Sequence, residues 1–341
     1  MKGVPHPFPY QGSKRQLASQ IVACIPHRTY RLIEPFVGSG AITLATAYLH
    51  RTSRFIISDL HQPLITLWHS IIYDPDQLAD RYEDLWNRQQ GRQREFYDEV
   101  RVLFNQTHEP HYFLYLLARC VKAAVRYNAE GQFNNSPDNR RLGMRPKTMR
   151  RNILNSSQLL RGKLQVLCQD YRETLKTADS HDVVYLDPPY QGVTNSRDRR
   201  YYSGINFQTF VRTLEDLNSR QIRFIISYDG RTGSKVHGQL LPKHLELIHK
   251  EIKVGRSAQA TLLGKEDTTV ESLYLSRVLI ERIGAIPAAL TSAFSENLFI
   301  KTCAKSNTPK RSSRRSTPSV GNAREWSLST YSNMAALLLS R

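Results

Sequence analysis

The chain has 341 residues, of which 40% are hydrophobic, so it is long enough to bury a sizeable core in one large domain or two unequal ones. Its formal net charge of +18 favours a polyanionic partner, with DNA or RNA ahead of an anionic membrane surface. A run of about 18 or more apolar residues is absent, which excludes a membrane-spanning helix, and the first residues lack the apolar core of a secretory signal. The cysteines form no CxxC pair, so we expect a cytoplasmic protein with reduced thiols and no metal site.

The N-terminal part of the chain predicts the start of a parallel α/β sheet. Apolar residues at helical spacing follow the loop Tyr10–Lys14, with Ser13 in the position of an N-cap. We next expect a buried strand over residues 31–34, a glycine turn over 38–40 and a helix over 41–50. A second strand over 55–58, which ends in Asp59, and a further helix over 64–73 follow. Strand, glycine turn and helix form the first half of a nucleotide-binding βαβ unit.

The turn Gly38-Ser39-Gly40 is a candidate cofactor site. A single GxG is a weak signal, because any tight connection between a strand and a helix favours glycine. Asp59 strengthens the interpretation, since an acidic residue about twenty positions on is placed to accept both hydroxyls of a ribose. The alternative makes Asp59 an N-cap. The spacing fits NAD and S-adenosylmethionine alike, but Thr43 stands where a dinucleotide site has its third glycine, so we expect no pyrophosphate cradle.

Strand signals are absent over about residues 74–163, which predicts a helical insertion. We expect helices over residues 76–90, 93–106 and 110–126, followed by a polar loop over 127–146. Residues 119–163 contain eleven Lys and Arg against only Glu130 and Asp138, and eleven minus two leaves an excess of +9. We therefore expect this segment to contact the nucleic acid.

The α/β pattern resumes after the insertion. We expect five strands and one helix, the strands over residues 164–168, 183–186, 223–227, 244–252 and 269–276 and the helix over 207–219. Beyond Arg282 the composition changes to Ser, Thr, Pro, Lys and Arg, which predicts a basic, disordered tail.

The most specific motif is Asp187-Pro188-Pro189-Tyr190, which directly follows the buried run Val183–Leu186. It therefore falls where an α/β sheet presents its chemistry. Proline carbonyls stay outside the local hydrogen-bond ladder, so the Pro188 carbonyl and the Asp187 carboxylate can accept the two hydrogens of an exocyclic amine such as that of adenine. Tyr190 can stack on the base. The alternative is a proline-rich strand exit without a catalytic role.

Together these motifs resemble the Dam-like family of DNA adenine-N6 methyltransferases, in the alpha arrangement that places target recognition between the cofactor and catalytic motifs. The resemblance rests on four stretches with the basic insertion between the third and fourth, namely Tyr10–Lys14, Glu34–Gly40, Ser58-Asp59 and Asp187–Tyr190. Further similar stretches are Arg126–Asn134, Phe224–Asp229, Gly255–Thr261 and Glu271–Tyr274. The similarity covers about residues 5–280.

The resemblance implies S-adenosylmethionine as the cofactor and double-stranded DNA as the partner. The catalytic residues that it implies are Asp187, Pro188, Pro189 and Tyr190. The cofactor-binding residues that it implies are Tyr10, Lys14, Glu34, Phe36, Gly38, Gly40, Asp59 and Asp187. Asp170 either approaches the adenine site or caps a helix. The candidate DNA-binding residues of the insertion are Arg126, Asn128, Arg140, Arg141, Arg145, Lys147 and Arg150.

The predicted fold class is α/β, with the Rossmann-like sheet of the S-adenosylmethionine-dependent methyltransferases and an inserted, mostly helical target-recognition domain. The expected domains are a catalytic domain over 1–75 and 164–282, target recognition over 76–163 and the tail over 283–341. We expect a monomer that acts independently of any cognate restriction endonuclease and does not bind membranes.

Alternatives to this function remain. An N4-cytosine DNA methyltransferase would use the same amine chemistry, although that group more often carries serine in place of Asp187. In RNA and protein-amide methyltransferases the catalytic motif usually begins with asparagine. A non-catalytic DNA-binding protein would explain the charge but would leave the acceptor pair without a purpose.

Overall fold

A computed structural model of the chain describes residues 1, 3–189, 205–232, 235–237, 239–256 and 268–284. These residues belong to a compact unit that spans Met1–Ser295. A second unit, Glu296–Arg341, lies outside the described residues, as do Tyr190 and nearly all of the expected tail. Within the described part of the chain, no helix combines the length and the apolar character needed to cross a bilayer.

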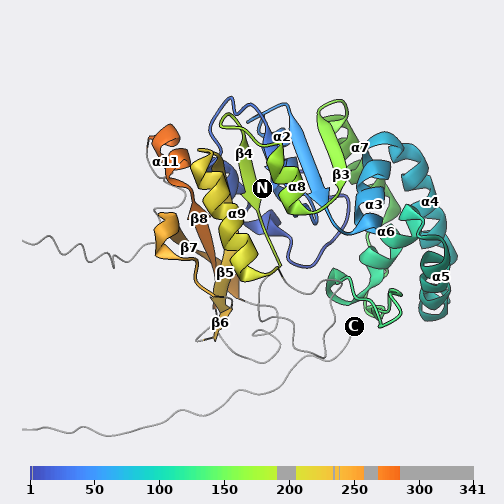
Figure 1. Cartoon of the computed structure of the whole chain (residues 1–341). Coiled ribbons are helices and arrows are strands. Elements are labelled where there is room, and N and C mark those ends of the chain that lie inside the picture. The colour runs from blue at the N-terminus through green and yellow to red at the C-terminus, as the bar shows by residue number, and fades with distance from the viewer. Residues whose placement is uncertain (2, 190–204, 233–234, 238, 257–267, 285–341) are drawn as a thin grey trace, which may run out of the picture. The chain divides into compact units, whose positions relative to one another are not determined.

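An eight-stranded sheet forms the centre of the unit, in the order β3-β2-β1-β4-β5-β8-β7 with β6 paired to β5 (Figure 1). The strands are β1 (Leu32–Glu34), β2 (Phe55–Asp59), β3 (Leu164–Cys168), β4 (Val183–Leu186), β5 (Arg223–Thr232), β6 (Lys235–His237), β7 (Ile248–Arg256) and β8 (Thr268–Leu275). The strands from β3 to β5 in this order run parallel, whereas β8 is antiparallel to both β5 and β7. The predicted Rossmann-like α/β fold is confirmed, although the extension of β5 and its partner β6 were not predicted.

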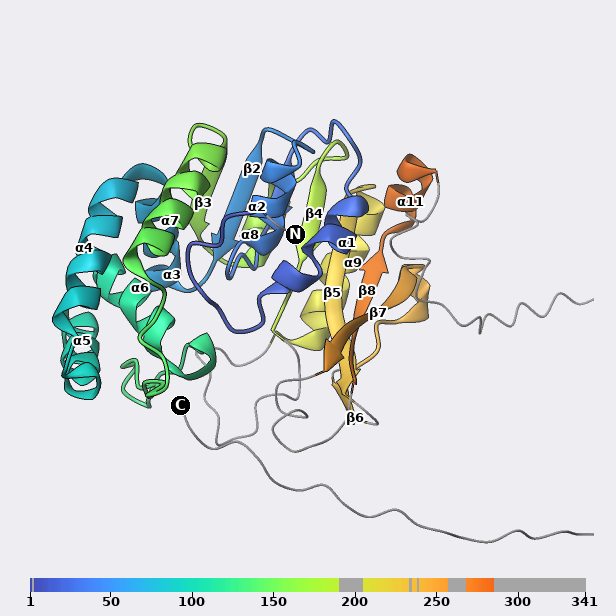
Figure 2. The same cartoon turned by 180° about the vertical axis from the view of Figure 1, so that it is seen from behind.

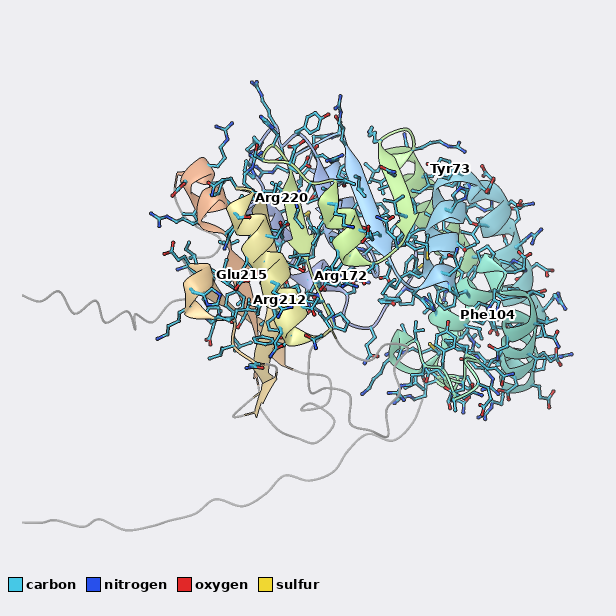
Figure 3. The ribbon with its side chains drawn as sticks, viewed as in Figure 1. Tyr73, Phe104, Arg172, Arg212, Glu215 and Arg220 are labelled. Carbon is cyan, nitrogen blue, oxygen red and sulfur yellow. The ribbon has the colours of Figure 1, made fainter. Side chains whose placement is uncertain are left out.

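Short helices accompany the sheet. They are η1 (Lys14–Gln16), α1 (Ala18–Ala23), α2 (Ala41–Tyr48), α3 (Gln62–Tyr73), α8 (Tyr171–Lys176), α9 (Phe207–Ser219), η3 (Lys243–Leu245) and α11 (Arg277–Ile283). Helix α11 was not predicted, and α8 was expected only as the helix that Asp170 would cap, because one or two turns give little periodic signal. Arg220, which follows α9, donates hydrogen bonds to the carbonyls of Leu175 and Ala178 and so ties α9 to the end of α8 (Figure 3).

Both faces of the sheet are buried by alternating side chains. On β4, Val184 and Leu186 join the hydrophobic core that includes α8 and α9, while Val183 and Tyr185 join the core that includes α1 and α2. Figure 1 shows α8 and α9 in front of the sheet, and Figure 2 shows α1 and α2 on the opposite face. A strand buried on both sides needs a continuous apolar sequence, which is why the run before Asp187 does not alternate with polar residues.

The insertion forms a helical cluster beside the β3 edge (Figure 1). Its elements are α4 (Pro75–Arg88), α5 (Gln93–Thr107), α6 (Pro110–Arg119), η2 (Val121–Ala123) and α7 (Pro146–Leu160). The rings of Phe104, Phe113 and Phe133 pack against one another in its core, and Figure 3 marks Phe104. The apolar side chains of the insertion thus form one continuous hydrophobic core with those on one face of the sheet.

Two expectations for the insertion were wrong. The helix predicted over 110–126 ends at Arg119, because Cys120 takes an extended conformation and Lys122 a left-handed one. Helix α7 was not predicted, since its sequence continues the polar composition of the loop before it. Two signals for α7 were present in the sequence, namely Pro146 at a first helical position and apolar residues at helical spacing, Met149, Ile153 and Leu160.

We predict that Gly40→Ala destabilises the fold by about 2–4 kcal/mol. Gly40 has a φ of +58°, and an added Cβ would lie 2.6 Å from the ring of Trp68, which is fully buried. Gly91→Ala is the matched control, because Gly91 has a φ of +80° but no atom near its Cβ position. Unfolding in denaturant should show a smaller loss for the control, and equal losses would contradict the role assigned to Trp68.

Candidate active site

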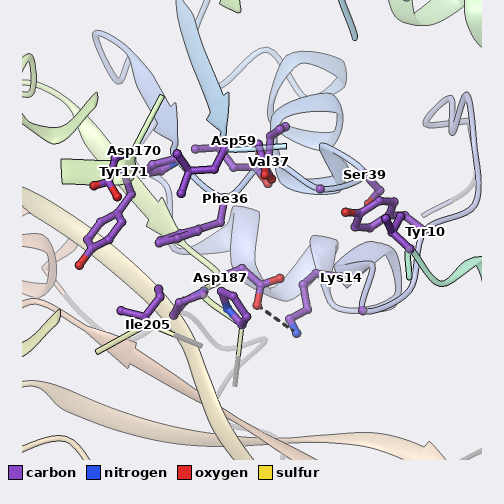
Figure 4. A pocket seen from close by; sticks show the side chains of 18 of the residues that line it. Tyr10, Lys14, Phe36, Val37, Ser39, Asp59, Asp170, Tyr171, Asp187 and Ile205 are labelled. Carbon is purple, nitrogen blue, oxygen red and sulfur yellow. Dashed lines mark ion pairs between the residues drawn. The ribbon is translucent and has the colours of Figure 1, made fainter. Parts of the chain in front are cut away.

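The main cavity lies at the carboxyl ends of the parallel strands and has a volume of about 570 Å³. Its wall combines the segments that directly follow β1, β2 and β4 with the loop that precedes η1 (Figure 4). The residues predicted for the site that line this cavity are Tyr10, Lys14, Glu34, Phe36, Gly38, Asp59, Asp187, Pro188 and Pro189. Parallel strands bring these ends together, so motifs that are far apart in the sequence share one cavity.

Two residues predicted for the site are not placed in this wall. Gly40 does not line the cavity, because its α-carbon faces Trp68 and its left-handed conformation starts α2. Its contribution is to the turn, where its amide donates to the Val37 carbonyl. Tyr190 lies outside the described residues.

The glycine turn is held from two sides. The indole of Trp68 donates to the carbonyl of Gly38 at 3.0 Å, and a Cβ on Gly38 would lie 3.4 Å from the ring of Tyr10. The Ser39 hydroxyl lies 2.7 Å from that of Ser13. The predicted N-cap position of Ser13 is confirmed, since Ser13 directly precedes η1, but its hydroxyl bonds across to the turn and makes no capping bond.

Glu34 is buried at the end of β1, where its carboxylate accepts hydrogen bonds from the amide and the hydroxyl of Thr43. Burial raises the pKa of Glu34 to about 8, and the bonds from Thr43 oppose this rise. Thr43 occupies the position at which a dinucleotide site would have its third glycine. Its side chain therefore has a function of its own here, which is to hold Glu34 in the cavity wall.

Asp59 connects the cavity with the insertion. Its carboxylate accepts a hydrogen bond from the amide of His61 at 3.0 Å, and Nε2 of His61 lies 2.6 Å from the Tyr127 hydroxyl. Burial lowers the pKa of His61 to about 3, so the ring is neutral in this contact. A second link is the hydrogen bond from the Gln11 amide to the Ala123 carbonyl at 3.1 Å. Neither of these two links was predicted from the sequence.

The wall opposite Lys14 includes residues that the sequence indicated only in part. The interpretation of Asp170 as a helix cap is confirmed, because its carboxylate accepts from the amide of Arg172 at 2.9 Å at the start of α8, and the residue also lines the cavity. The next residue, Tyr171, was missed. Its ring centre lies 5.0 Å from that of Phe36, and both rings line the cavity. The short strand ending at Cys168 was the only available signal, since it places Tyr171 at the same sheet edge.

Asp187 forms an ion pair with Lys14, with Nζ of Lys14 3.2 Å from Oδ1 of Asp187 (Figure 4). Lys14 is only 6% exposed, and its Nζ also lies 3.2 Å from Oε2 of Glu271 on β8. Burial raises the pKa of Asp187 to about 6, an effect that Lys14 opposes and Glu271 reinforces. Glu271 was not among the predicted site residues.

Two of the candidate DNA-binding residues lie at a turn of the insertion that is closed by a bridge between Tyr127 and Phe133. Asn128 holds the turn together, because its side chain accepts from the amide of Gln132 at 2.7 Å. Arg126 directly precedes this turn and is partly buried.

The other candidates lie in the loop before α7 or within α7. Arg140 and Arg141 are 82% and 78% exposed beside Asp138, and Arg145 and Lys147 are exposed at the start of the helix. Arg150 differs from them, because its guanidinium is paired with both Asp80 and Glu83 of α4.

Comparison with known proteins identifies the family. A family model described as D12 class N6 adenine-specific DNA methyltransferase matches residues 10–256. The chain belongs to this family. The matched range begins at Tyr10 and includes every motif that carries the resemblance up to Gly255-Arg256, so the resemblance inferred from the sequence is confirmed.

Several curated proteins are similar to the chain at modest identity. The DNA adenine methylase of Haemophilus influenzae is 28% identical over 228 residues, covering 64% of this chain and 77% of that protein. The type II methyltransferase M.MjaIII of Methanocaldococcus jannaschii is 28% identical over 215 residues, covering 58% and 73%. The DNA N-6-adenine-methyltransferase of Escherichia phage P1 is 28% identical over 240 residues, which cover 65% of this chain but only 29% of that longer protein.

We predict that the ionisation of Glu34 destabilises the fold as the pH rises. The folded-state pKa of about 8 lies above the ordinary 4.5, so the stability contributed by the neutral acid is fully present below pH 4.5 and is lost as the pH rises towards 8. Between pH 5 and 8 the wild type should lose about 1–3 kcal/mol more than Glu34→Gln does, measured by denaturant unfolding. Glu246→Gln, at an exposed position, should follow the wild type. Parallel stability curves for wild type and Glu34→Gln would contradict the assignment.

Proposed function

We propose that this member of the family transfers a methyl group from S-adenosylmethionine to N6 of adenine in double-stranded DNA. The observation that carries the proposal is that Asp187 and Pro188 line the same cavity as Asp59 and Gly38. An amine-binding pair of acceptors and a nucleoside-binding edge are therefore close enough to share reactants. The family membership supports the same reaction.

The cavity is suited to S-adenosylmethionine in size and in chemistry. Its volume of about 570 Å³ is typical of sites for small molecules. We assign the Asp59 carboxylate to the ribose hydroxyls, and the rings of Phe36 and Tyr171 to the faces of the cofactor base. Tyr10 and Glu34 are assigned to the methionine end. When bound, this cofactor supplies an electrophilic methyl group on a sulfonium sulfur.

Asp187 and the Pro188 carbonyl act on the target amine. The amino nitrogen of adenine is a poor nucleophile, because its lone pair is delocalised into the ring. Accepting its two hydrogens at the carboxylate and the carbonyl raises the electron density on nitrogen and favours the tetrahedral geometry that develops during attack. As the N–C bond forms, the bond from the methyl carbon to the sulfur would break, and the amine would lose one proton to solvent, with Asp187 as its hydrogen-bond acceptor. Positioning and electrostatics provide the rate enhancement.

The target adenine has to leave the double helix to reach this cavity, at a cost of a few kcal/mol. We assign stacking on the extruded base to Tyr190, and contacts to the DNA backbone to the insertion over 76–163. The exposed cations Arg140, Arg141 and Arg145 support this assignment. Their side chains are the type that reads guanine edges or binds phosphates.

The amine chemistry also allows an N4-cytosine methyltransferase, but Asp187 and the family membership favour adenine. We further propose that the chain acts in the cytoplasm as a monomer and independently of any endonuclease. The name of the Methanocaldococcus relative, a type II methyltransferase, supports a place in a restriction-modification system. Methylation mapping in a bacterial host without N6-methyladenine would give the recognised sequence.

We predict that Asp187→Ala lowers methyl transfer by about 10²-fold or more, because one of the two amine acceptors is lost. The measurement is transfer of labelled methyl from S-adenosylmethionine to duplex DNA. DNA binding should stay near the wild-type level, since Asp187 lies inside the cavity and carries no positive charge. Asp216→Ala is the control, because Asp216 is an exposed carboxylate on α9 that pairs only with Arg220 among the described residues. Wild-type turnover by Asp187→Ala would refute the assignment.

A second prediction concerns the salt dependence of DNA binding. Replacing both Arg145 and Lys147 by Gln should weaken binding and reduce the slope of log K against log salt by about two, if each cation contacts one phosphate. Arg150→Gln is the matched control, because Asp80 and Glu83 already offset the charge of Arg150. Titrations at several salt concentrations measure both slopes. If the slope changed equally per charge removed in the two variants, the exposure of a cation would not determine its contribution to DNA binding.

A further inference from the structure

Glu271 lies at the active site but has no part in the chemistry described above. It is on β8, paired in register with Gly230 of β5 and Ile252 of β7. From the sheet it reaches Lys14, whose ammonium lies 3.2 Å from a Glu271 oxygen and 3.2 Å from an Asp187 oxygen. One cation thus bridges two carboxylates that come from different strands.

The three charged side chains of this bridge are mostly buried, so their relative positions determine how strongly they interact. The side chains of Lys14, Asp187 and Glu271 are 6%, 21% and 20% exposed. Charges that are mostly withdrawn from water interact strongly, so each carboxylate affects where the ammonium lies. A lysine side chain has four flexible carbons, and a single ion pair would fix its position poorly. Two carboxylates on either side define that position.

We propose that Glu271 is a positioning residue for methyl transfer, which holds the Lys14 ammonium against Oδ1 of Asp187 so that the carboxylate keeps a fixed orientation towards the target amine. This inference rests on the proposed function. Glu271 is not part of the cavity wall, and it acts on the Asp187 carboxylate through its contact with Lys14 and through its own negative charge. The bridge also explains why a lysine of the N-terminal loop is buried beside the catalytic motif.

The charges around Asp187 give this role a signature in the pH dependence. Among the described residues, the charged and titratable groups that interact with Asp187 are Lys14 from η1, Glu271 from β8, Glu34 from β1 and Tyr185 from β4. The negative charge of Glu271 raises the pKa of Asp187, and the positive charge of Lys14 lowers it. Since the acceptor must be ionised, the acid limb of the rate profile follows this pKa.

The test compares wild type, Glu271→Gln and Lys14→Gln in pH profiles of methyl transfer by the full chain on duplex DNA. Glu271→Gln should lower kcat about 10- to 100-fold with KM for DNA unchanged, because the acceptor is misplaced but the DNA surface is intact. Its acid limb should move to lower pH, while that of Lys14→Gln should move to higher pH. Glu271→Asp keeps the charge, so its acid limb should stay near that of the wild type. Glu246→Gln, an exposed carboxylate near β7, should leave both kcat and the profile unchanged.

A second measurement does not depend on activity. The titration of Asp187, followed by carboxyl NMR of the chain labelled with ¹³C-aspartate, should shift to lower pH in Glu271→Gln. A wild-type kcat in Glu271→Gln, or an Asp187 titration that does not move, overturns the inference. If the wild type itself transfers no methyl group to adenine, the proposed function fails, while the NMR titration still decides whether Glu271 acts on Asp187.

Discussion

The ion pair between Lys14 and Asp187 is the interaction on which the arrangement of the site depends. It joins η1 to the residue that directly follows β4, and both side chains line the cavity. The sheet brings the acceptor to its edge, but a strand end alone would leave the carboxylate free to rotate. The cation fixes it, and the withdrawal of both groups from water makes the contact strong enough to do so. The glycine turn and Asp59 contribute to the wall of the same cavity.

The fold could be predicted where the sequence alternates between short apolar runs and turns. The strands β1 to β4 and helix α9 lie within a residue or so of the expected ranges, because buried parallel strands require uninterrupted apolar residues. The insertion was predicted less well. Helix α7 has an amphipathic pattern that the polar residues on its exposed face conceal, and the end of α6 depends on the left-handed conformation of Lys122, which its residue type does not indicate.

The site could be predicted where its residues belong to contiguous motifs. Asp59 ends β2, Gly38 lies in the turn that follows β1, and Asp187 directly follows β4, so topology alone places them together. Glu271 and Tyr171 could not be derived in this way. Glu271 lies inside an antiparallel strand, where the sequence does not tell which face meets the cavity, and its partner Lys14 is far away along the chain. Gly40 belongs to the motif, yet the shape of Trp68 decides its surroundings.

Two of the links between the insertion and the rest of the unit have a consequence for engineering hybrid enzymes. The ring of His61 contacts the Tyr127 hydroxyl, and the backbone of Gln11 bonds to that of Ala123, so the insertion is joined to the rest of the unit at points away from its two sequence ends. Exchanging the segment between relatives at its sequence ends would carry over Tyr127 but leave His61 behind. A functional chimera therefore has to take both partners of each contact from the same parent protein, His61 with Tyr127 and the segment around Gln11 with that around Ala123.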